Sequence, residues 1–382
     1  MDPIYLDYSA TTPVRAEVRD AMLPLFSERF GNASSLHRWG REARAALEQA
    51  RARLAAVLGA APSEVIFTRG GTESDNLAVL GRARLVAGAP VVCSAIEHKA
   101  VLASAQAAAA AGSPFHLLPV DGAGVVTADA LAPLLAERPT VVSVMWVNNE
   151  VGTVQPVEQL AVECAAADVT FHTDAVQAFG KIPVRVDRLP AALVSVSAHK
   201  IGGPKGVGAL FVRRGTKLEP LIYGGGHERG MRAGTEDVAG AVGLALAAEL
   251  AASEMEMEMA RLGELRDRLE LALARSVPEL VINGAGAARV PTILNVSIPG
   301  VNADALIPTL DLEGIALSSG SACSSGAVTP SHVLTAMGVP AEVAGPSVRF
   351  SLGHQTTSAE IDRVIAVFPT LMTRLRQFAA AG

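Results

Sequence analysis

Residues 195–206 read Ser-Val-Ser-Ala-His-Lys-Ile-Gly-Gly-Pro-Lys-Gly and lie between two apolar runs, Ala192–Val194 and Gly208–Val212. This pattern predicts a buried strand, a loop and a second strand, with Lys200 in the loop. Burial and a neighbouring cation disfavour the ammonium form of a lysine, so an amine in this position can act as a nucleophile. An ordinary surface turn would contain the same residue types, and the rest of the chain has to decide between the two interpretations.

Upstream of this stretch, short apolar runs alternate with segments of helical length. Such a rhythm predicts an α/β fold with a mostly parallel sheet that is covered by helices on both faces. The predicted strands are Glu64–Thr68, Pro90–Ser94, Phe115–Val120, Thr140–Val147, Val169–Thr173 and Leu193–Ser197.

Downstream, a helical pattern runs from Glu236 to about Arg275 with one or more breaks, and it leads into a second, smaller α/β domain. The apolar runs Thr292–Ile298 and Val348–Leu352 supply strands for this domain. We therefore predict a large domain over residues 14–259 and a small domain formed by residues 1–13 and 260–382.

The composition limits the classes of partner. The 382 residues are 50% hydrophobic and carry a formal net charge of −6 without a basic run, so neither nucleic acid nor an anionic membrane is expected to bind. The pattern of a signal peptide is absent, as is an apolar stretch of about 18 residues. The three cysteines lack the spacing of a metal site or a disulfide framework, so no metal is expected and a cytoplasmic location is predicted.

Polar side chains follow five of the predicted strands, at the edge where ligands bind in parallel α/β sheets. Because the carboxyl ends of parallel strands meet at the same edge, we expect these side chains to form one site. The five segments are Arg69–Asn76, Glu97–Lys99, Asn148–Glu150, Asp174–Gln177 and Ser197–Lys200.

Two of these segments indicate the kind of ligand. Gly70-Gly71-Thr72 opens a helix directly after a strand, so its backbone N–H groups and the positive helix end would face an anion such as a phosphate. Asp174 has no cation beside it in the sequence and needs a positive partner, for which a protonated pyridine nitrogen is suitable.

The other polar groups complete a site for pyridoxal phosphate. Lys200 can bind the aldehyde, His98 can stack on the ring, and Asn149 and Gln177 can hydrogen-bond its phenolic oxygen. Each residue taken alone has a simpler interpretation, as a helix cap, a loop histidine or a surface amide. Their joint occurrence with the phosphate-binding turn and Asp174 favours the cofactor.

Long, ordered motifs along nearly the whole chain resemble those of the cysteine desulfurases of the IscS/NifS type. These enzymes belong to the class V aminotransferase group of fold-type I pyridoxal-phosphate enzymes, which have a large domain with a mostly parallel sheet and a smaller C-terminal α/β domain. The motifs that carry the resemblance are Tyr5–Pro13, Gly70–Asn76, Glu97–Ala100, Val147–Glu150, His172–Gln177, Gly224–Thr235, Ser318–Cys323 and Arg349–Gly353.

The resemblance assigns a role to each residue of the predicted site. Lys200 would hold the cofactor covalently, Asp174 would pair with the ring nitrogen, and His98 would stack on the ring. Asn149 and Gln177 would hold the substrate and the ring oxygen. The residues expected around the phosphate are Gly71, Thr72, Ser197 and His199.

Thr235 would reach the phosphate bound by the partner subunit, so the resemblance also implies a homodimer with composite sites. Two positions depart from the commonest pattern of the family. Arg69 stands where a small hydroxyl residue is usual, and Gly202 stands where tyrosine is frequent. Neither position has a role assigned above.

Cys323 lies in a run of small residues, 318–327, that offers almost no apolar anchor and is therefore expected to form a mobile surface loop. We hypothesise that Arg349 binds the carboxylate of L-cysteine, because a guanidinium fork suits that group. Lys200 would then remove the Cα proton while His98 shuttles a proton. Attack of the Cys323 thiolate on the substrate sulfur would leave alanine and a persulfide on Cys323.

Other functions remain open at this stage. Another class V enzyme, such as a serine aminotransferase or a kynureninase-like hydrolase, would keep the cofactor residues without needing Cys323, and a selenocysteine lyase would share nearly all of them. A non-catalytic sulfur-relay subunit is disfavoured by the intact Lys200, Asp174 and Cys323. The resemblance implies an acceptor protein such as an iron–sulfur scaffold, although thiolated tRNA, thiamine or DNA phosphorothioation pathways are equally compatible.

Overall fold

The computed structural model describes residues 2–319 and 330–381 and is built around a seven-stranded sheet. In spatial order its strands are β2 (Val65–Thr68), β8 (Gly208–Val212), β7 (Leu193–Ser197), β6 (Thr170–Asp174), β5 (Val141–Ser143), β3 (Val91–Ser94) and β4 (Phe115–Leu118). Only β8 runs antiparallel to its neighbours. The prediction of a mostly parallel sheet is therefore confirmed.

Two predicted strands of the large sheet end earlier than expected, and one of them, β4, ends at Leu118 rather than at Val120. β5 ends at Ser143 rather than at Val147. Beyond Ser143 the chain still hydrogen-bonds along β6, through the N–H groups of Val144 and Trp146, but it no longer pairs with β3. The apolar run therefore continues to Val147, whereas pairing with both β3 and β6 ends at Ser143.

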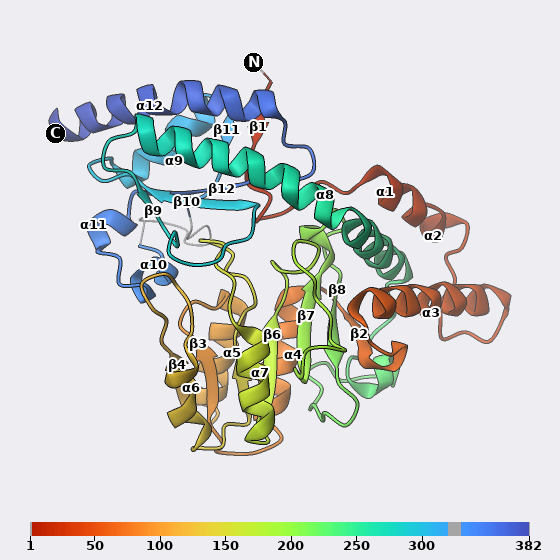
Figure 1. The fold of residues 1–382 in the computed structure, drawn as a ribbon. Coiled ribbons are helices and arrows are strands. Elements are labelled where there is room, and N and C mark those ends of the chain that lie inside the picture. Colours follow the sequence, from red (N-terminus) through yellow and green to blue (C-terminus); the bar gives the residue numbers. More distant parts are fainter. Residues whose placement is uncertain (1, 320–329, 382) are drawn as a thin grey trace.

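Helices cover both faces of this sheet (Figure 1). Those near it in the chain are α1 (Ala16–Met22), α2 (Pro24–Ser27), α3 (Arg38–Leu58), α4 (Gly71–Ala83), α5 (Lys99–Ala110), α6 (Ala128–Leu135) and α7 (Val157–Ala166). α4 and α5 share an apolar cluster with β3 and β5, whereas α3, α6 and α7 contribute to the main core on the other face.

A second group of elements packs above the large sheet in Figure 1. Its strands are β9 (Val281–Ile282), β10 (Ile293–Ser297) and β12 (Ser347–Ser351) in an antiparallel sheet, and β1 (Ile4–Tyr5) paired in parallel with β11 (Ile315–Ala316). Its helices are α9 (Ala303–Leu312), α10 (His332–Ala336), α11 (Ala341–Ala344) and α12 (Ser358–Ala381). Ile4 and Leu6 of the N-terminal leader are buried in the core of this group, while the domain boundary near residue 260 stays a prediction.

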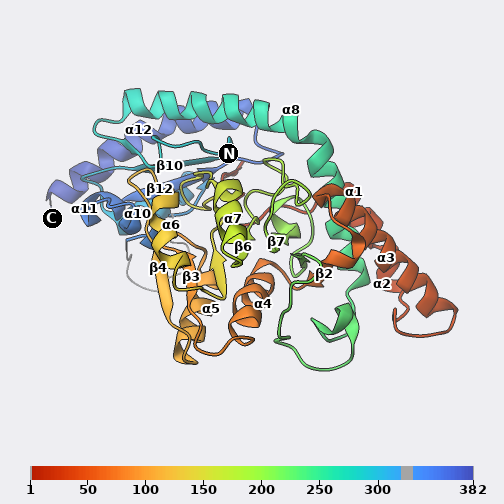
Figure 2. The same cartoon turned by 60° about the horizontal axis from the view of Figure 1, so that its bottom comes forward.

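The helix α8 (Val238–Ser276) connects the two groups and lies alongside α12 in both views (Figures 1 and 2). It is continuous over 39 residues, so the predicted breaks are wrong; no proline interrupts it. Leu244 packs in the core of the large sheet and Leu269 in that of the small one. Its length and composition would allow it to span a membrane, but half of its most apolar window is buried inside the protein, as in the core helix of a soluble protein.

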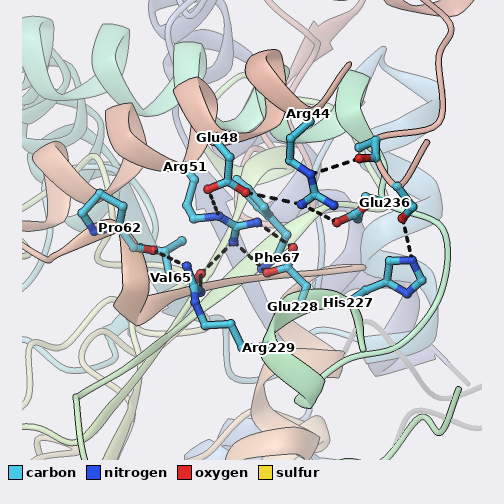
Figure 3. A network of polar contacts seen from close by, with 12 residues as sticks. Arg44, Glu48, Arg51, Pro62, Val65, Phe67, His227, Glu228, Arg229 and Glu236 are labelled. Carbon is cyan, nitrogen blue, oxygen red and sulfur yellow. Dashed lines mark hydrogen bonds and ion pairs between the residues drawn. The ribbon is translucent and has the colours of Figure 1, made fainter. Parts of the chain in front are cut away.

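A buried ion pair fastens the segment 224–235 to α3. Arg51 Nη1 and Nη2 donate to Glu228 Oε2 and Oε1 over 2.7 and 2.8 Å, and the Phe67 N–H donates to the same carboxylate (Figure 3). Arg51 also donates to the Val65 carbonyl and to Glu48. Each donor nitrogen of Arg51 and each oxygen of Glu228 therefore has a partner.

The backbone of this segment is held in an unfavourable conformation. Glu228 and Arg229 both have positive φ angles, 45° and 58°, which residues with a Cβ rarely adopt. The Arg51–Glu228 pair supplies the contacts that hold this turn in place.

Candidate active site

The carboxyl ends of β2, β3, β5, β6 and β7 open on a cavity of about 370 Å³, as the sequence predicted. Leader residues and two residues from the second group of elements complete its wall. The lining comprises Ser9, Ala10, Gly71, Thr72, Asp75, His98, Lys99, Met145, Asn149, Glu150, Asp174, Val176, Gln177, Ser197, His199, Lys200, His332 and Arg349.

Lys200 lies in a 3-10 turn, Ala198–Lys200, between β7 and β8. Its Nζ donates to the carbonyl oxygens of Ser9 and Ala10, the second over 2.8 Å. The lysine therefore reaches from the large sheet to the N-terminal leader, and it points into the cavity rather than into solvent as a surface turn would place it.

The start of α4 provides the predicted anion site. Gly70 precedes the helix with a φ of 137°, and it offers no side chain to cap the first turn. A Cβ at Gly71 would lie 2.8 Å from Val176 Cγ2, so only glycine fits at this wall of the cavity. The Ser197 hydroxyl lies beside this turn, is buried, and has no hydrogen-bond partner among the described residues.

His199 lies at the same end of the cavity. Its Nδ1 is 3.2 Å from the Thr11 hydroxyl. Burial, with Lys200 and Lys205 nearby, lowers its pKa to about 4. The ring is therefore neutral at pH 7 and can hydrogen-bond an anion without adding a charge.

Asp174 ends β6 and is almost fully buried. Its Oδ1 accepts the Val176 N–H over 2.8 Å. Burial raises the pKa of Asp174, against the opposing effects of His98 and Lys200. A cation such as a protonated pyridine nitrogen would relieve this cost.

Behind Asp174 lies a second buried carboxyl group that the sequence analysis did not assign. Asp75 is 1% exposed, and burial followed by the charge of Asp174 raises its pKa well above the usual range. The Ser195 hydroxyl hydrogen-bonds to His172 Nε2 over 2.9 Å. Burial lowers the His172 pKa to about 3, so this imidazole is neutral.

His98 caps the first turn of α5. Its Nδ1 accepts the Ala100 N–H over 3.1 Å, which leaves Nε2 to carry the ring proton. Burial lowers the His98 pKa, while Asp174 opposes this and Lys200 and Lys99 contribute to it. His98 therefore caps α5 through Nδ1 and also lines the cavity, where Nε2 is available to a ligand.

Arg349 of β12 lines the same cavity and is 3% exposed. Nη1 donates to the Asn149 carbonyl over 2.8 Å, and Nη2 donates to Asp7 Oδ1 over 2.7 Å. Its Nε lacks a partner among the described residues. The guanidinium is thus held rigidly with donors left over for an anionic substrate group.

Two described positions of the predicted segments, Thr235 and Arg69, do not line this cavity. Thr235 is exposed and does not line it. Cys323 lies outside the described residues. Arg69 forms a partly exposed ion pair with Asp237 instead of facing the phosphate-binding turn.

The polar lining residues without an assigned role include Ser9, Asp75, Glu150 and His332. Asp75 and Glu150 stand directly beside assigned residues in the polar segments after β2 and β5, so proximity in the sequence was a usable signal. Ser9 and His332 come from distant parts of the chain, and no local pattern connects them with Lys200.

The cavity fits pyridoxal phosphate by its own chemistry. Ser9 Oγ, Asp75 Oδ1 and Ser197 Oγ are buried polar atoms without partners among the described residues, and all line this space. Such atoms are costly unless a ligand or water satisfies them. An amine, a buried carboxylate and a glycine-lined helix start are the three groups that the aldehyde, the ring nitrogen and the phosphate require.

Comparisons with known proteins agree with this arrangement. A family model described as aminotransferase class-V matches residues 4–364. A curated protein named cysteine desulfurase IscS, from Dictyoglomus turgidum, is 46% identical over 375 residues that cover 98% of this chain and 95% of the relative. Among solved structures, a NifS-like protein has a TM-score of 0.91 at 36% identity, covering 98% of this chain and 100% of its own. The structure named SspA in complex with cysteine has a TM-score of 0.80 at 36% identity, covering 91% and 98%.

Proposed function

The chain belongs to the class V aminotransferase family and resembles its IscS/NifS-type members throughout, and on this premise we propose that it is a pyridoxal-phosphate-dependent cysteine desulfurase. The enzyme converts L-cysteine to L-alanine and passes the sulfur to an acceptor protein. The observation that carries the proposal is the convergence of Lys200, Asp174 and Arg349 on one cavity lined by unsatisfied polar atoms.

Several residues of the cavity have a task in this reaction. Arg349 binds the carboxylate of L-cysteine, with Asn149 beside it. Pyridoxal phosphate, when bound, supplies an electron sink that stabilises negative charge at the substrate Cα. Asp174 would hold the protonated ring nitrogen, and Lys200 Nζ, which lines the same cavity, would accept the Cα proton of the substrate.

The sulfur step belongs to Cys323. Its thiolate attacks the substrate sulfur, so that one S–S bond forms and the substrate C–S bond breaks. The electron pair of that bond stays with the substrate carbon, which is then protonated to give alanine. We assign to His98 Nε2 the delivery or uptake of a proton in this step; the contact of Nδ1 with the Ala100 N–H and the position of His98 in the cavity lining support this role.

We propose that two copies of the chain form the enzyme. Phe26, Phe30 and Leu36 are each more than 60% exposed, and they lie on the segment that leads into α3. The Ser34 hydroxyl contacts His227 over 3.0 Å, which connects this segment to the one that carries Thr235. A second copy seated on this apolar face would bury it and bring Thr235 near the partner's cavity.

The acceptor is proposed to be an iron–sulfur scaffold or another protein of thio-cofactor synthesis, in the cytoplasm. A reducing compartment suits a thiol that cycles between free and persulfide forms. Cys93 and Cys164 are free and buried, which agrees with such a compartment.

The function is tested by incubating the purified protein with L-cysteine and a reductant, and measuring alanine and sulfide. Cys323→Ala should abolish both products, whereas Ser324→Ala, in the same segment, should keep them. If the wild type binds pyridoxal phosphate without a visible absorbance band, the role of Lys200 is wrong. If Cys323→Ala releases as much sulfide as the wild type, the persulfide role is wrong.

A further inference from the structure

Lys181 lies beside the active site without a role in it. It lines a second cavity of about 400 Å³, which shares Ser9 and Lys200 with the cofactor cavity. Lys181 is therefore part of the partition between the two cavities. It follows Gln177 by four residues, in the turn after β6.

The contacts of Lys181 fix the orientation of the Gln177 amide. Lys181 Nζ donates to Gln177 Oε1, and Gln177 Nε2 donates to the Ser9 carbonyl over 2.9 Å. An ammonium group can only donate and a carbonyl can only accept, so both partners specify the same arrangement of the amide oxygen and nitrogen. Lys200 Nζ donates to the same Ser9 carbonyl, which ties the three side chains into one network.

This arrangement decides what Gln177 offers to the cavity. Its oxygen is engaged by Lys181, and one of its two Nε2 hydrogens is engaged by Ser9. The second hydrogen remains for a group in the cofactor cavity, which Gln177 lines. Gln177 therefore acts as a donor, and the group that it suits is an acceptor such as an ionised phenolic oxygen.

The surroundings of Lys181 favour a hydrogen-bonding role over an ion-pair role. Within residues 2–319 and 330–381, no carboxylate lies within 4.0 Å of its Nζ. Burial, together with the charges of Lys200 and Arg349, lowers the Lys181 pKa to about 7. Both protonation states keep N–H groups, so the contact with Gln177 Oε1 persists through this titration.

We propose that Lys181 is a positioning residue that holds the Gln177 amide with its nitrogen toward the phenolic oxygen of pyridoxal phosphate. The inference rests on the proposed function, because it takes that cofactor as the occupant of the cavity. Without Lys181 the Ser9 carbonyl alone specifies the orientation, so the amide spends part of its time rotated with its oxygen toward the ionised phenolic oxygen, which repels it and weakens cofactor binding.

The experiment is a double-mutant cycle on the protein loaded with pyridoxal phosphate. It compares wild type, Lys181→Met, Gln177→Ala and the double variant, with cofactor affinity and the midpoint of the pH titration of the visible band as readouts. Lys181→Met should weaken cofactor binding about 2- to 10-fold. It should also raise the midpoint by about 0.5–1 pH unit, because the negative phenolic oxygen loses its donor.

The cycle separates positioning from a general charge effect. If Lys181 acts through Gln177, Lys181→Met causes no further shift of the midpoint in the Gln177→Ala background. Lys181→Arg, which keeps a donor, should restore most of the wild-type midpoint, and the exposed Lys217→Met should leave it unchanged. Equal shifts in both backgrounds, or a wild-type midpoint in Lys181→Met, would overturn the proposal.

Failure of this inference and failure of the proposed function give different results. A wild-type protein that does not bind pyridoxal phosphate contradicts the proposed function. A wild type that binds it and makes alanine, with an unchanged Lys181→Met, contradicts only the role of Lys181. Thermal unfolding of each variant without cofactor shows whether a spectral change reflects the site or a damaged fold.

Discussion

Two buried polar regions of this protein differ in how completely their groups are paired. In the network around Arg51 and Glu228, every donor nitrogen of the arginine and both oxygens of the carboxylate have partners (Figure 3). In the cofactor cavity, Ser197 Oγ and Asp75 Oδ1 have no hydrogen-bond partner among the described residues, and burial raises the pKa of Asp174 although the nearby His98 and Lys200 oppose this.

The difference separates structural from functional polarity. In a fully paired buried network the hydrogen bonds and ion pairs offset the cost of desolvation. Removing one member therefore lowers the free energy of unfolding. Buried groups without partners pay the desolvation cost until a ligand binds to them. Removing one of them therefore lowers ligand affinity or the reaction rate rather than stability. Substitutions in the two regions should therefore have opposite effects on stability and on activity.

The paired network should respond as a unit of the fold. Glu228→Ala leaves the Arg51 guanidinium buried without its carboxylate, and we expect the free energy of unfolding to fall by about 3–5 kcal/mol. Urea denaturation measures this change. The control is Glu42→Ala, which breaks the exposed Arg38–Glu42 pair and should change the stability little. Similar losses in both variants would contradict the contrast.

The cavity should respond in the opposite way. Asp174→Asn removes a carboxylate whose burial costs more than its neighbours recover, as its raised pKa indicates, so the stability of the cofactor-free protein should not fall. The same change removes the partner of the ring nitrogen, and kcat for alanine formation should fall about 100-fold or more. If Asp174→Asn lowered the free energy of unfolding and left kcat unchanged, Asp174 would have a structural role and the contrast would be contradicted.

The pH dependence of stability sharpens the contrast further. Burial raises the Glu97 pKa to about 8 and the Glu150 pKa to about 7, so the folded protein holds protons that the unfolded chain releases. The stability that these groups provide is full below about pH 4.5 and is lost as the pH rises through 7 and 8, with a slope of up to about 1.4 kcal/mol per pH unit for each proton.

Glu97→Gln should therefore flatten the fall in stability between pH 5 and pH 8, measured by denaturation of the cofactor-free protein. Glu150 still titrates in this variant, so part of the slope remains. A slope identical to that of the wild type would show that Glu97 is ionised in the folded state.

The smallest expected effect concerns single hydroxyl groups. Ser197→Ala removes a hydroxyl without a partner among the described residues, so stability should hold while pyridoxal phosphate binding weakens by about 1 kcal/mol, roughly five-fold. Ser143→Ala is the matched control, because its hydroxyl hydrogen-bonds to His172 Nδ1 over 2.8 Å. That variant should lose stability and keep its affinity for the cofactor, and the reverse pattern would contradict the account.

The sequence predicted the elements of the large sheet and the site at their carboxyl ends because both depend on local order along the chain. Each predicted strand run places its own polar residues at the same edge, so Asp174 and Lys200 could be brought together without knowing any long-range contact. Gly70 and Gly71, at the start of α4, were likewise recognisable in the sequence as a turn that exposes backbone N–H groups.

Contacts between distant segments could not be predicted. Asp7 holds Arg349, which is 342 residues away, and Glu228 holds Arg51, which is 177 residues away; no periodicity connects either pair. The role inferred for Lys181 also depends on Ser9, which belongs to the leader. The continuity of α8 was missed because a helix that passes from one core to another changes its buried face along its length.

In the proposed reaction the sulfur atom of L-cysteine becomes bound to Cys323. Mass analysis of the protein after a single turnover detects this sulfur on the residue that carries it. The protein loaded with pyridoxal phosphate is mixed with one equivalent of L-cysteine without reductant, then blocked with an alkylating reagent and digested. We expect the peptide that contains Cys323 to be heavier by one sulfur atom, with an equal amount of alanine released. Alanine formed without added sulfur on that peptide, or with the sulfur on Cys93 or Cys164, would contradict the account.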